Sequence, residues 1–515
     1  MSIPEPSAIG IDLGTTNCCV AVFRNGRCEA VPSGNGSTTI PSYVAFEDDH
    51  CVVGQEAKDN AFGHPKGTIF AVKRILGHRY SEVEDGVRLS QRWPFALTAD
   101  ENGFAAVRLP DDCGMTKVIW KPEEVSGELL KHLKELAQDF LGCPVQRAVI
   151  TVPASFTEHQ RRCTLAAGIM AGLEVVGIVN EPTAAAIAYG LQTPAGENEK
   201  TRIILVCDFG GGTIDVSIIS AVGRSTFQVL GTSGNMHLGG EDFDDCLVEE
   251  LLLRWEELHG PGIRQSPAAM TRLRKQAQQV KHTLATGTEE NAGVVLASLF
   301  GGVDFRTTVS RTTFEKVCGH LFQQALEPIE TAMRLTNMRK QDLSHIVLVG
   351  GSSRMRVFRD MVADYFPDQR IFKDIHPDEA IAIGAGLMAQ NAGELTVADV
   401  IALDLGTEVW GGGMTVILPR FSKVPSSAEK VFTTTVDFQT RISVMVYEGT
   451  DPVAKNNRFW GRLLMTGIQP ALAGFPKIAV TYEYDHFGIL KVSAKDLATD
   501  STVETSINLN VPNGS

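Results

Sequence analysis

The chain has 515 residues, 43% of them hydrophobic, which is enough for two or three domains with sizeable cores. A formal net charge of −14 argues against nucleic acid or an anionic membrane as the main partner, and no apolar run approaches the length of a transmembrane helix. The opening residues show no signal or transit pattern, and the ten cysteines form no Cys-x-x-Cys pair. These features predict a cytoplasmic protein with reduced thiols.

The first predicted element is a strand that ends in a carboxylate. Residues 9–16 read IGIDLGTT, in which an apolar strand leads to Asp12, a glycine and two threonines, and VAVF at 20–23 suits a returning strand. Glycines allow positive φ and close approach of the backbone to a ligand, and successive N–H groups can cradle phosphate oxygens. A carboxylate beside such a loop is expected to hold hydrated Mg²⁺, because it would repel phosphate directly.

Further along the chain, four segments have clear secondary-structure signals. The apolar stripe of residues 124–141, followed by Gly142, predicts an amphipathic helix. RAVITVP predicts a strand that ends at Pro153, and NEPT opens an Ala-rich helix in which Glu181 stands at the start, where the helix dipole favours negative charge. The spacing of apolar residues over 267–285 predicts a second amphipathic helix.

The opening pattern recurs at 203–217, where IILVCDFGGGTIDVS places Asp208 before three glycines and Thr213. Either hairpin alone could use its glycines only to turn the chain. Two similar hairpins far apart in the sequence predict instead two related lobes that hold one nucleotide between them. Their separation is too long for a solenoid repeat, so we expect duplication of a whole domain.

From about residue 404 the pattern changes to alternating, β-branched segments. These segments read VFTTTVDF, RISVMVYEG, KIAVTYEYD, ILKVSAKD and STVETSINL. Such a succession of short strands predicts a β-sandwich.

Several ordered motifs together resemble those of one known family. IGIDLGTTN, DFGGGTIDVS, NEPTAAAIAYG and VLVGGSSRM resemble the nucleotide-binding signatures of the 70-kDa heat-shock chaperones, within the broader actin and sugar-kinase fold. The similarity continues through HLGGEDFD, HPDEAIAIGAG and the C-terminal part. It implies an α/β, actin-like, two-lobed ATPase domain at 1–395, with lobes at about 1–192 and 201–395. A linker at 396–405 and a β-sandwich peptide-binding domain at 406–515 would follow, with no helical lid.

The resemblance also implies ATP or ADP as ligand, with Mg²⁺ and, as a further ion, K⁺. Asp12 and Asp208 would hold the metal through water, and Lys73 and Glu181 would position the attacking water, with Thr213 beside them. Without the resemblance, Lys73 would be interpreted as a solvated surface charge. The other nucleotide-binding positions that it implies are Gly14, Thr15, Thr16, Asn17, Gly210, Gly211, Gly212, Gly239, Gly240, Gln278, Lys281, His282, Gly350, Gly351, Ser352, Arg354 and Asp378.

Two further sets of residues are carried over from the family. Pro153, Arg161 and Asp404 would relay the nucleotide state between domains, although a strand-ending proline and a surface arginine are the simpler readings of the first two. The implied peptide-binding residues are Leu405, Val409, Trp410, Phe432, Thr435, Ile442 and Val444. These seven could instead fill the core of the sandwich.

The sequence departs from the family pattern at the nucleoside site. Gln278, His282 and Ala285 stand where the family usually has Glu, Arg and Ser. Loss of a carboxylate and a hydroxyl removes two hydrogen bonds to ribose, each worth about 0.5–1.5 kcal/mol, so we expect weaker nucleotide binding than the family norm. Trp410 is bulkier than the aliphatic residue that usually arches over the peptide.

Three functions are compatible with these observations. The first is an ATP-hydrolysing chaperone for unfolded, apolar peptide segments, with a nucleotide exchange factor and a J-domain co-chaperone as partners. The second is a lidless regulatory or ribosome-associated co-chaperone that assists another chaperone. Ala402 in the linker and Gly177, which replaces a basic residue that helps contact J-domains, favour this second function. The third, a sugar kinase, lacks a recognisable sugar site and leaves the sandwich unexplained.

Overall fold

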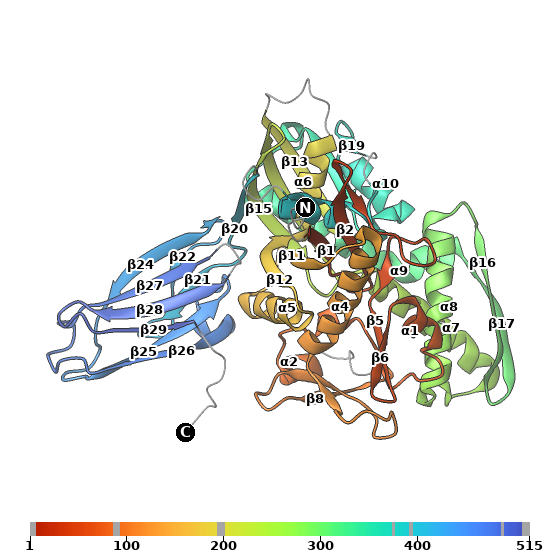
Figure 1. Cartoon of the computed structure of the whole chain (residues 1–515), viewed down its shortest axis with the longest axis horizontal. Helices are drawn as coiled ribbons and strands as arrows, with labels where there is room; N and C mark the ends of the chain where they lie inside the picture. The colour runs from red at the N-terminus through yellow and green to blue at the C-terminus, as the bar shows by residue number, and fades with distance from the viewer. Residues whose placement is uncertain are drawn as a thin grey trace. The chain divides into compact units, whose positions relative to one another are not determined.

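The computed structural model describes residues 7–85, 93–192, 201–372, 376–390, 395–485 and 489–506 (Figure 1). The chain forms two compact units, Met1–Val397 and Ala398–Ser515. The division falls within β20 (Thr396–Val400), in the segment expected as a linker, and Asp399 and Val400 pair with β23 (Lys423–Val424) inside the second unit. The expected junction between the lobes, 193–200, lies outside the described residues.

The first lobe is built on a sheet with the strand order β12-β11-β1-β2-β3. These strands are β1 (Ser7–Asp12), β2 (Asn17–Arg24), β3 (Arg27–Ala30), β11 (Val145–Val152) and β12 (Glu174–Asn180). β1, β11 and β12 run parallel, β2 is antiparallel to β1, and β3 is antiparallel to β2. The apolar runs of β1 and β2 are buried, as expected for strands covered on both faces.

The second lobe repeats this topology with the order β19-β18-β13-β14-β15. Its strands are β13 (Thr201–Phe209), β14 (Ile214–Val222), β15 (Thr226–Asn235), β18 (His345–Val349) and β19 (Arg370–Phe372). β13, β18 and β19 run parallel, β14 is antiparallel to β13, and β15 is antiparallel to β14. The same order and the same directions in both sheets agree with the expected duplication, and the two strands that carry Asp12 and Asp208, β1 and β13, hold equivalent places.

Helices cover both sheets and separate them. α4 (Pro122–Leu141) and α5 (Glu158–Met170) lie together beside the first sheet (Figure 1). α11 (Ala380–Gln390) packs on β1 and β2, α6 (Glu181–Gln192) packs on β13 and β14, and the two helices pack against each other between the lobes. α9 (Arg311–Leu335) and α10 (Arg356–Tyr365) complete the second lobe.

Each lobe carries an additional subdomain. In the second lobe it consists of α7 (Gly240–His259), α8 (Pro267–Thr286) and the hairpin of β16 (Asn291–Phe300) and β17 (Val303–Ser310). α8 is the helix predicted over 267–285, and the Ser266 side chain caps it by accepting the N–H of Ala269. The first-lobe subdomain contains β4 (Ile40–Pro41), β5 (Tyr43–Glu47), β6 (His50–Val53), α1 (Gln55–Asn60), β7 (Thr68–Phe70), α2 (Tyr80–Asp85), β8 (Ala96–Ala99), β9 (Ala105–Arg108) and β10 (Ile119–Trp120).

The second unit is a sandwich of two antiparallel sheets, ordered β22-β21-β25-β26 and β24-β27-β28-β29. The strands are β21 (Leu405–Glu408), β22 (Met414–Leu418), β24 (Ser426–Phe432), β25 (Arg441–Glu448), β26 (Arg458–Thr466), β27 (Ile478–Tyr484), β28 (Leu490–Asp496) and β29 (Thr502–Ser506). Between the sheets lies one apolar core that includes Trp460 and Tyr482. The predicted fold class, a two-lobed α/β domain followed by a β-sandwich, is therefore confirmed.

One predicted strand is wrong in part. Only Val431 and Phe432 of VFTTTVDF belong to a strand, because β24 ends at Phe432. The remainder forms a loop in which the Gln439 side chain accepts the N–H groups of Thr435 and Val436. Alternation of β-branched residues did not reveal that a side chain further along would satisfy these N–H groups in place of a strand partner.

Candidate nucleotide site

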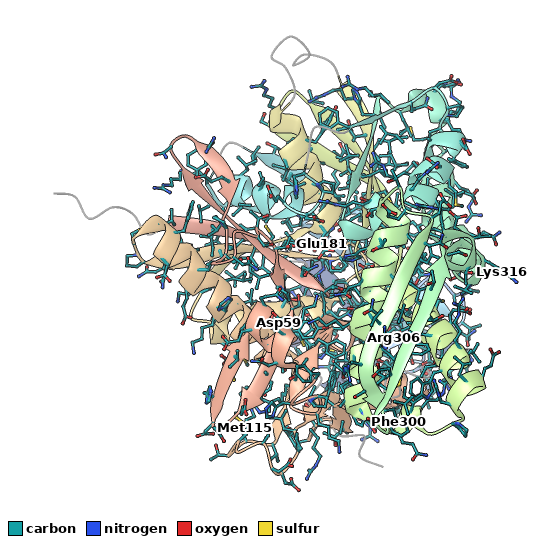
Figure 2. The ribbon with its side chains drawn as sticks, turned by 90° about the vertical axis from the view of Figure 1, so that its right-hand side faces the viewer. Asp59, Met115, Glu181, Phe300, Arg306 and Lys316 are labelled. Atoms are coloured by element: carbon teal, nitrogen blue, oxygen red, sulfur yellow. The ribbon has the colours of Figure 1, made fainter. Side chains whose placement is uncertain are left out.

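A cavity of about 450 Å³ lies between the lobes, where β1 and β13 end. It is lined by most of the residues that the sequence assigned to nucleotide and catalysis, namely Asp12, Gly14, Thr15, Thr16, Asn17, Lys73, Glu181, Asp208, Gly210, Gly211, Thr213, Gly240, Gln278, Lys281, His282, Gly350, Gly351, Ser352, Arg354 and Asp378. In Figure 2, Glu181 lies between the half that carries Asp59 and the half that carries Arg306. A larger hollow of about 1270 Å³ adjoins the cavity and shares Thr16 and Gln278 with it.

Lys73 and Glu181 form a buried ion pair in the lining of this cavity. Lys73 lies in the short helix η1 (Val72–Arg74), and its Nζ donates to Glu181 Oε1 at 2.6 Å and to the Leu13 carbonyl oxygen at 2.7 Å. Both side chains are less than a tenth exposed, so the reading of Lys73 as a solvated surface charge is wrong. Burial lowers the pKa of Lys73, but attraction by Glu181 and Asp12 outweighs it, and the net pKa is raised.

Asp12 and Asp208 bring two more carboxylates to the same place. Burial, followed by repulsion from Glu181, raises the pKa of Asp12 to about 7 and raises the pKa of Asp208 well above its ordinary value. The Thr151 hydroxyl lies 3.4 Å from Asp12, too far to satisfy the carboxylate well. Buried carboxylates that repel one another favour a cation between them.

The donor set fits a hydrated magnesium ion. Within the described part of the chain, no three His, Cys, Asp or Glu side chains converge closely enough to ligate a metal directly. Mg²⁺ loses its waters reluctantly and is commonly held by one or two carboxylates together with phosphate oxygens. Asp12 and Asp208 therefore suit a metal held through its water shell.

The glycine loop after β13 is fixed by backbone hydrogen bonds. The Gly210 N–H donates to the Thr213 carbonyl at 3.0 Å, and the N–H groups of Gly240 and Glu241 donate to the carbonyls of Gly210 and Gly211. A Cβ on Gly211 would lie 1.8 Å from Thr16 Oγ1, so the glycine-containing loops of the two lobes approach each other too closely for any side chain.

The remaining glycines serve the same close approach. Gly350 has φ of 78°, and a Cβ there would lie 2.5 Å from Asp208 Oδ1. Gly212 and Gly239 are not among the residues that line the cavity. A Cβ on Gly239 would be 2.3 Å from the Gly211 carbonyl, so this glycine allows α7 to begin against the loop.

Two polar residues next to the site were missed in the sequence, and neither lines the cavity itself. Arg74 reaches across the lobes, donating to Glu241 and Asp242 at 2.9 Å each. Asp215 accepts from Ser155 Oγ at 3.0 Å, and burial together with repulsion from Glu181 raises its pKa to about 7. The only signal was adjacency, because Arg74 follows Lys73 and Asp215 lies within the quoted DFGGGTIDVS string.

The three residues expected to relay the nucleotide state each make a hydrogen bond within the structure. Pro153 directly follows β11 and accepts the N–H of Phe156. Arg161 is only 7% exposed and donates to Asn180 Oδ1 at 2.6 Å, so the reading of Arg161 as a surface residue is wrong. Within the second unit, Asp404 Oδ1 accepts the N–H of Arg420 at 2.7 Å.

The expected peptide-binding residues differ in burial. Leu405 and Val444 lie in the core of the sandwich, as the alternative reading proposed for part of the set. Phe432 and Ile442 pack partly against that core, and Val409 is half-buried. Trp410 is 84% exposed, and Thr435 is also exposed.

These features define a class of protein. The two lobes have the same topology, and each contributes a hairpin that carries an aspartate beside a buried lysine. Together they form an actin-like nucleotide-hydrolysing domain, and the same chain also contains a β-sandwich unit. The chain belongs to the Hsp70 family, because the family model described as Hsp70 protein matches residues 8–513. The family resemblance expected from the motifs is thereby confirmed.

Individual relatives agree with this assignment. The chain is 39% identical over 509 residues to a heat shock 70 kDa protein of Neurospora crassa, covering 97% of this chain and 77% of that protein. It is 39% identical over 511 residues to heat shock cognate 70 kDa protein 3 of Dictyostelium discoideum, covering 97% and 80%. A heat shock 70 kDa protein of Emericella nidulans shows 39% identity over 509 residues, with coverage of 97% and 77%.

Members of the Hsp70 family share a general activity. Hsp70 proteins are ATP-dependent chaperones and ATPases that bind ATP or ADP with Mg²⁺ and engage unfolded client peptides. The helices in the described ranges include none that is long and apolar enough to cross a membrane.

Proposed function

We propose that this chain hydrolyses ATP in the cavity between β1 and β13, and that the nucleotide state controls peptide binding by the β-sandwich unit. The observation that carries the proposal is the Lys73–Glu181 ion pair, which lies in one cavity with Asp12 and Asp208. Phosphoryl transfer depends on positioning and on charge neutralisation more than on covalent chemistry, and this cavity provides both.

Each side chain has a distinct role in the proposed reaction. Lys73 remains an ammonium ion and donates a hydrogen bond to the attacking water, whose proton is directed toward Glu181. Asp12 and Asp208 would hold hydrated Mg²⁺, which neutralises charge on the phosphates, and the same carboxylates could hold K⁺. Thr213 and the glycine loop orient the phosphates through hydroxyl and N–H groups.

For peptide binding we propose an extended segment held by backbone hydrogen bonds and one apolar pocket. The half-buried Val409, Phe432 and Ile442 would line the pocket, whereas the core residues Leu405 and Val444 would support its floor. Trp410 and Thr435 are both exposed and could arch over the bound peptide. The large indole of Trp410 would favour partners with small side chains beneath it.

The residues proposed to relay the nucleotide state between the two units, and the proposed partners, are carried over from the family. Pro153 and Arg161 would transmit the state of the cavity, with Asp404 as the receiving residue in the second unit. A cytoplasmic location, a nucleotide exchange factor and a J-domain co-chaperone are part of the proposal. Gly177 is buried in β12 and lacks the basic side chain that would contact a J-domain, so stimulation by such a partner should be weak.

Single-turnover hydrolysis tests the proposal. The full chain is loaded with radiolabelled ATP and Mg²⁺, and hydrolysis is followed with and without an unfolded apolar peptide. We expect hydrolysis in both conditions and faster hydrolysis with peptide. Binding of ATP without any hydrolysis would contradict the proposed reaction.

A second candidate is a nucleotide-binding regulatory partner of another chaperone. It is favoured by the buried Gly177 and by the replacements at Gln278, His282 and Ala285 in the nucleotide cavity. Hydrolysis that responds to neither peptide nor a J-domain protein would support this candidate over the first.

A further inference from the structure

Two cysteines of the second lobe bring their sulfur atoms together from different helices. Cys246 lies in α7 and Cys318 lies in α9, and these two helices pack against each other. The side chains of the two cysteines are joined by a hydrogen bond. The proposed hydrolysis of ATP uses neither thiol, so the pair has no role in that reaction.

The two thiols differ in their access to solvent. Cys318 is completely buried in the core of the second lobe. Cys246 is half-buried, packs against that core, and lines the larger hollow of about 1270 Å³ beside the nucleotide cavity. A small solute in the hollow can therefore reach Cys246, whereas Cys318 is closed to solvent.

The hydrogen bond gives the two sulfur atoms different chemical roles. This bond first, and burial second, raise the pKa of Cys318, which therefore remains a protonated thiol that donates to the Cys246 sulfur. A donated hydrogen bond stabilises a thiolate, which is the reactive form of cysteine. The neighbouring carboxylates of Asp244 and Asp245 each pair with a basic side chain of α8, which limits their repulsion of a thiolate at Cys246.

We propose that Cys246 and Cys318 form a redox site, in which a hydroperoxide oxidises Cys246 and Cys318 then closes an intramolecular disulfide between α7 and α9. Reactive cysteines are partly exposed and buried ones are inert, which matches the order of the two steps. The contact between the side chains places the second thiol where it can attack the oxidised sulfur. The site is separate from the nucleotide chemistry, so its failure would leave the proposed ATPase intact.

The proposed oxidation balances over two steps. In the first, the Cys246 thiolate attacks one oxygen of the hydroperoxide, an S–O bond forms, the O–O bond breaks, and the departing hydroxide or alkoxide takes a proton from solvent. In the second, the Cys318 sulfur attacks the Cys246 sulfur, the S–S bond forms and the S–O bond breaks. The departing hydroxide takes the thiol proton of Cys318 and leaves as water. The two sulfur atoms together lose two electrons, and the peroxide gains them.

Mass spectrometry of the full chain after treatment with hydrogen peroxide tests the proposal. Remaining thiols are blocked by alkylation, and the protein is digested without reductant. We expect a peptide that joins Cys246 to Cys318, comes from a single chain, and is lost on reduction. Oxidation of other cysteines while both of these stay reduced would overturn the proposal. A joined peptide found only in covalent dimers would contradict it as well.

Serine variants separate the two steps. In Cys318→Ser the second thiol is missing, so the sulfenic acid of Cys246 should accumulate and react with a 1,3-diketone probe. In Cys246→Ser the accessible sulfur is missing, and Cys318 should stay reduced. Cys113→Ser, at a half-buried cysteine of the first lobe, is the matched control and should still give the joined peptide. A sulfenic acid trapped at Cys318 in Cys246→Ser would contradict the assigned roles.

Amide hydrogen exchange checks whether the disulfide ties the two helices together. The oxidised protein should exchange the amides of α7 and α9 several-fold more slowly than the reduced protein, because a cross-link opposes separation of the helices. Peroxide-treated Cys246→Ser should show no such slowing. Equal exchange in the oxidised and reduced forms of the original protein would show that no bond joins α7 to α9.

Discussion

Lys58 Nζ on α1 donates to Gln278 Oε1 on α8 at 3.1 Å, which connects the first lobe to the second at the edge of the nucleotide cavity. A second link lies beside it, because Lys275 Nζ of α8 is 3.3 Å from Asp59 Oδ1 of the first lobe. Figure 2 labels Asp59 on the first-lobe subdomain. A nucleotide leaving the cavity past this edge would have to break both links.

Gln278→Glu should slow the release of nucleotide. The substitution turns a neutral hydrogen bond into an ion pair with Lys58, and a partly exposed ion pair is worth about 0.2–1 kcal/mol, which corresponds to a rate lowered by up to about fivefold. Stopped-flow release of a fluorescent ADP measures the effect, which should shrink at high salt because the pair is screened. Gln279→Glu adds the same charge on the exposed side of α8 and should not alter release.

Lys73→Ala should abolish hydrolysis while nucleotide binding persists. Removing a charged donor that acts on the reacting groups costs about 10²–10³ in rate, whereas the phosphate loops and Asp12 remain. Single-turnover hydrolysis and ADP titration measure the two properties separately. Lys66→Ala, at an exposed lysine, should change neither. Unaltered turnover in Lys73→Ala would remove this residue from the mechanism.

Asp215 should make the nucleotide-free protein less stable as the pH rises from about 4 to about 7. Its folded-state pKa of about 7 exceeds the ordinary value of 3.8, so the folded state holds the proton more tightly than the unfolded state. The resulting stability is fully present below the unfolded pKa and is lost as pH rises through the folded one, with a slope of at most about 1.4 kcal/mol per pH unit. Asp12, raised in the same direction, adds to this loss.

Asp215→Asn should therefore flatten the dependence of melting temperature on pH between about 4 and 7. The amide oxygen can still accept from Ser155 Oγ, so the hydrogen bond need not be lost. Melting curves in the presence of a chelator measure the slope. Asp368→Asn, at an exposed carboxylate, should leave the slope as it is. If Asp215→Asn gave the same slope as the original protein, Asp215 would not be the titrating group.

Leu405 and Trp410 should respond differently to truncation, although the sequence assigned both to peptide binding. Leu405→Ala should destabilise the second unit by about 2–5 kcal/mol, because its side chain is completely buried in the sandwich core. Trp410→Ala should change stability by less than about 0.5 kcal/mol while altering peptide affinity, because its indole is exposed. Denaturant unfolding and the anisotropy of a labelled apolar peptide distinguish the two effects. A loss of stability in Trp410→Ala equal to that of Leu405→Ala would contradict this division.

Local sequence pattern was sufficient to predict the two hairpins that carry Asp12 and Asp208, the helices α4 and α8, and the β-sandwich. In each case the signal is short in range, since strand–Asp–Gly order, helical spacing and alternation all arise from neighbours in the chain. The repeat of one hairpin was also sufficient to predict two lobes. Where a local signal was misread, as after Phe432, a side chain beyond the strand satisfied the backbone instead.

The tertiary structure alone decided the environments of the polar side chains. Lys73 and Glu181 are 108 residues apart, and only the packing of the first lobe places them 2.6 Å from each other. The burial of Arg161, the reach of Arg74 across the lobes and the position of Leu405 in the core have the same origin. Periodicity shows which side of an element is apolar, but the charge that a side chain meets there comes from segments distant in the chain, which no local spacing specifies.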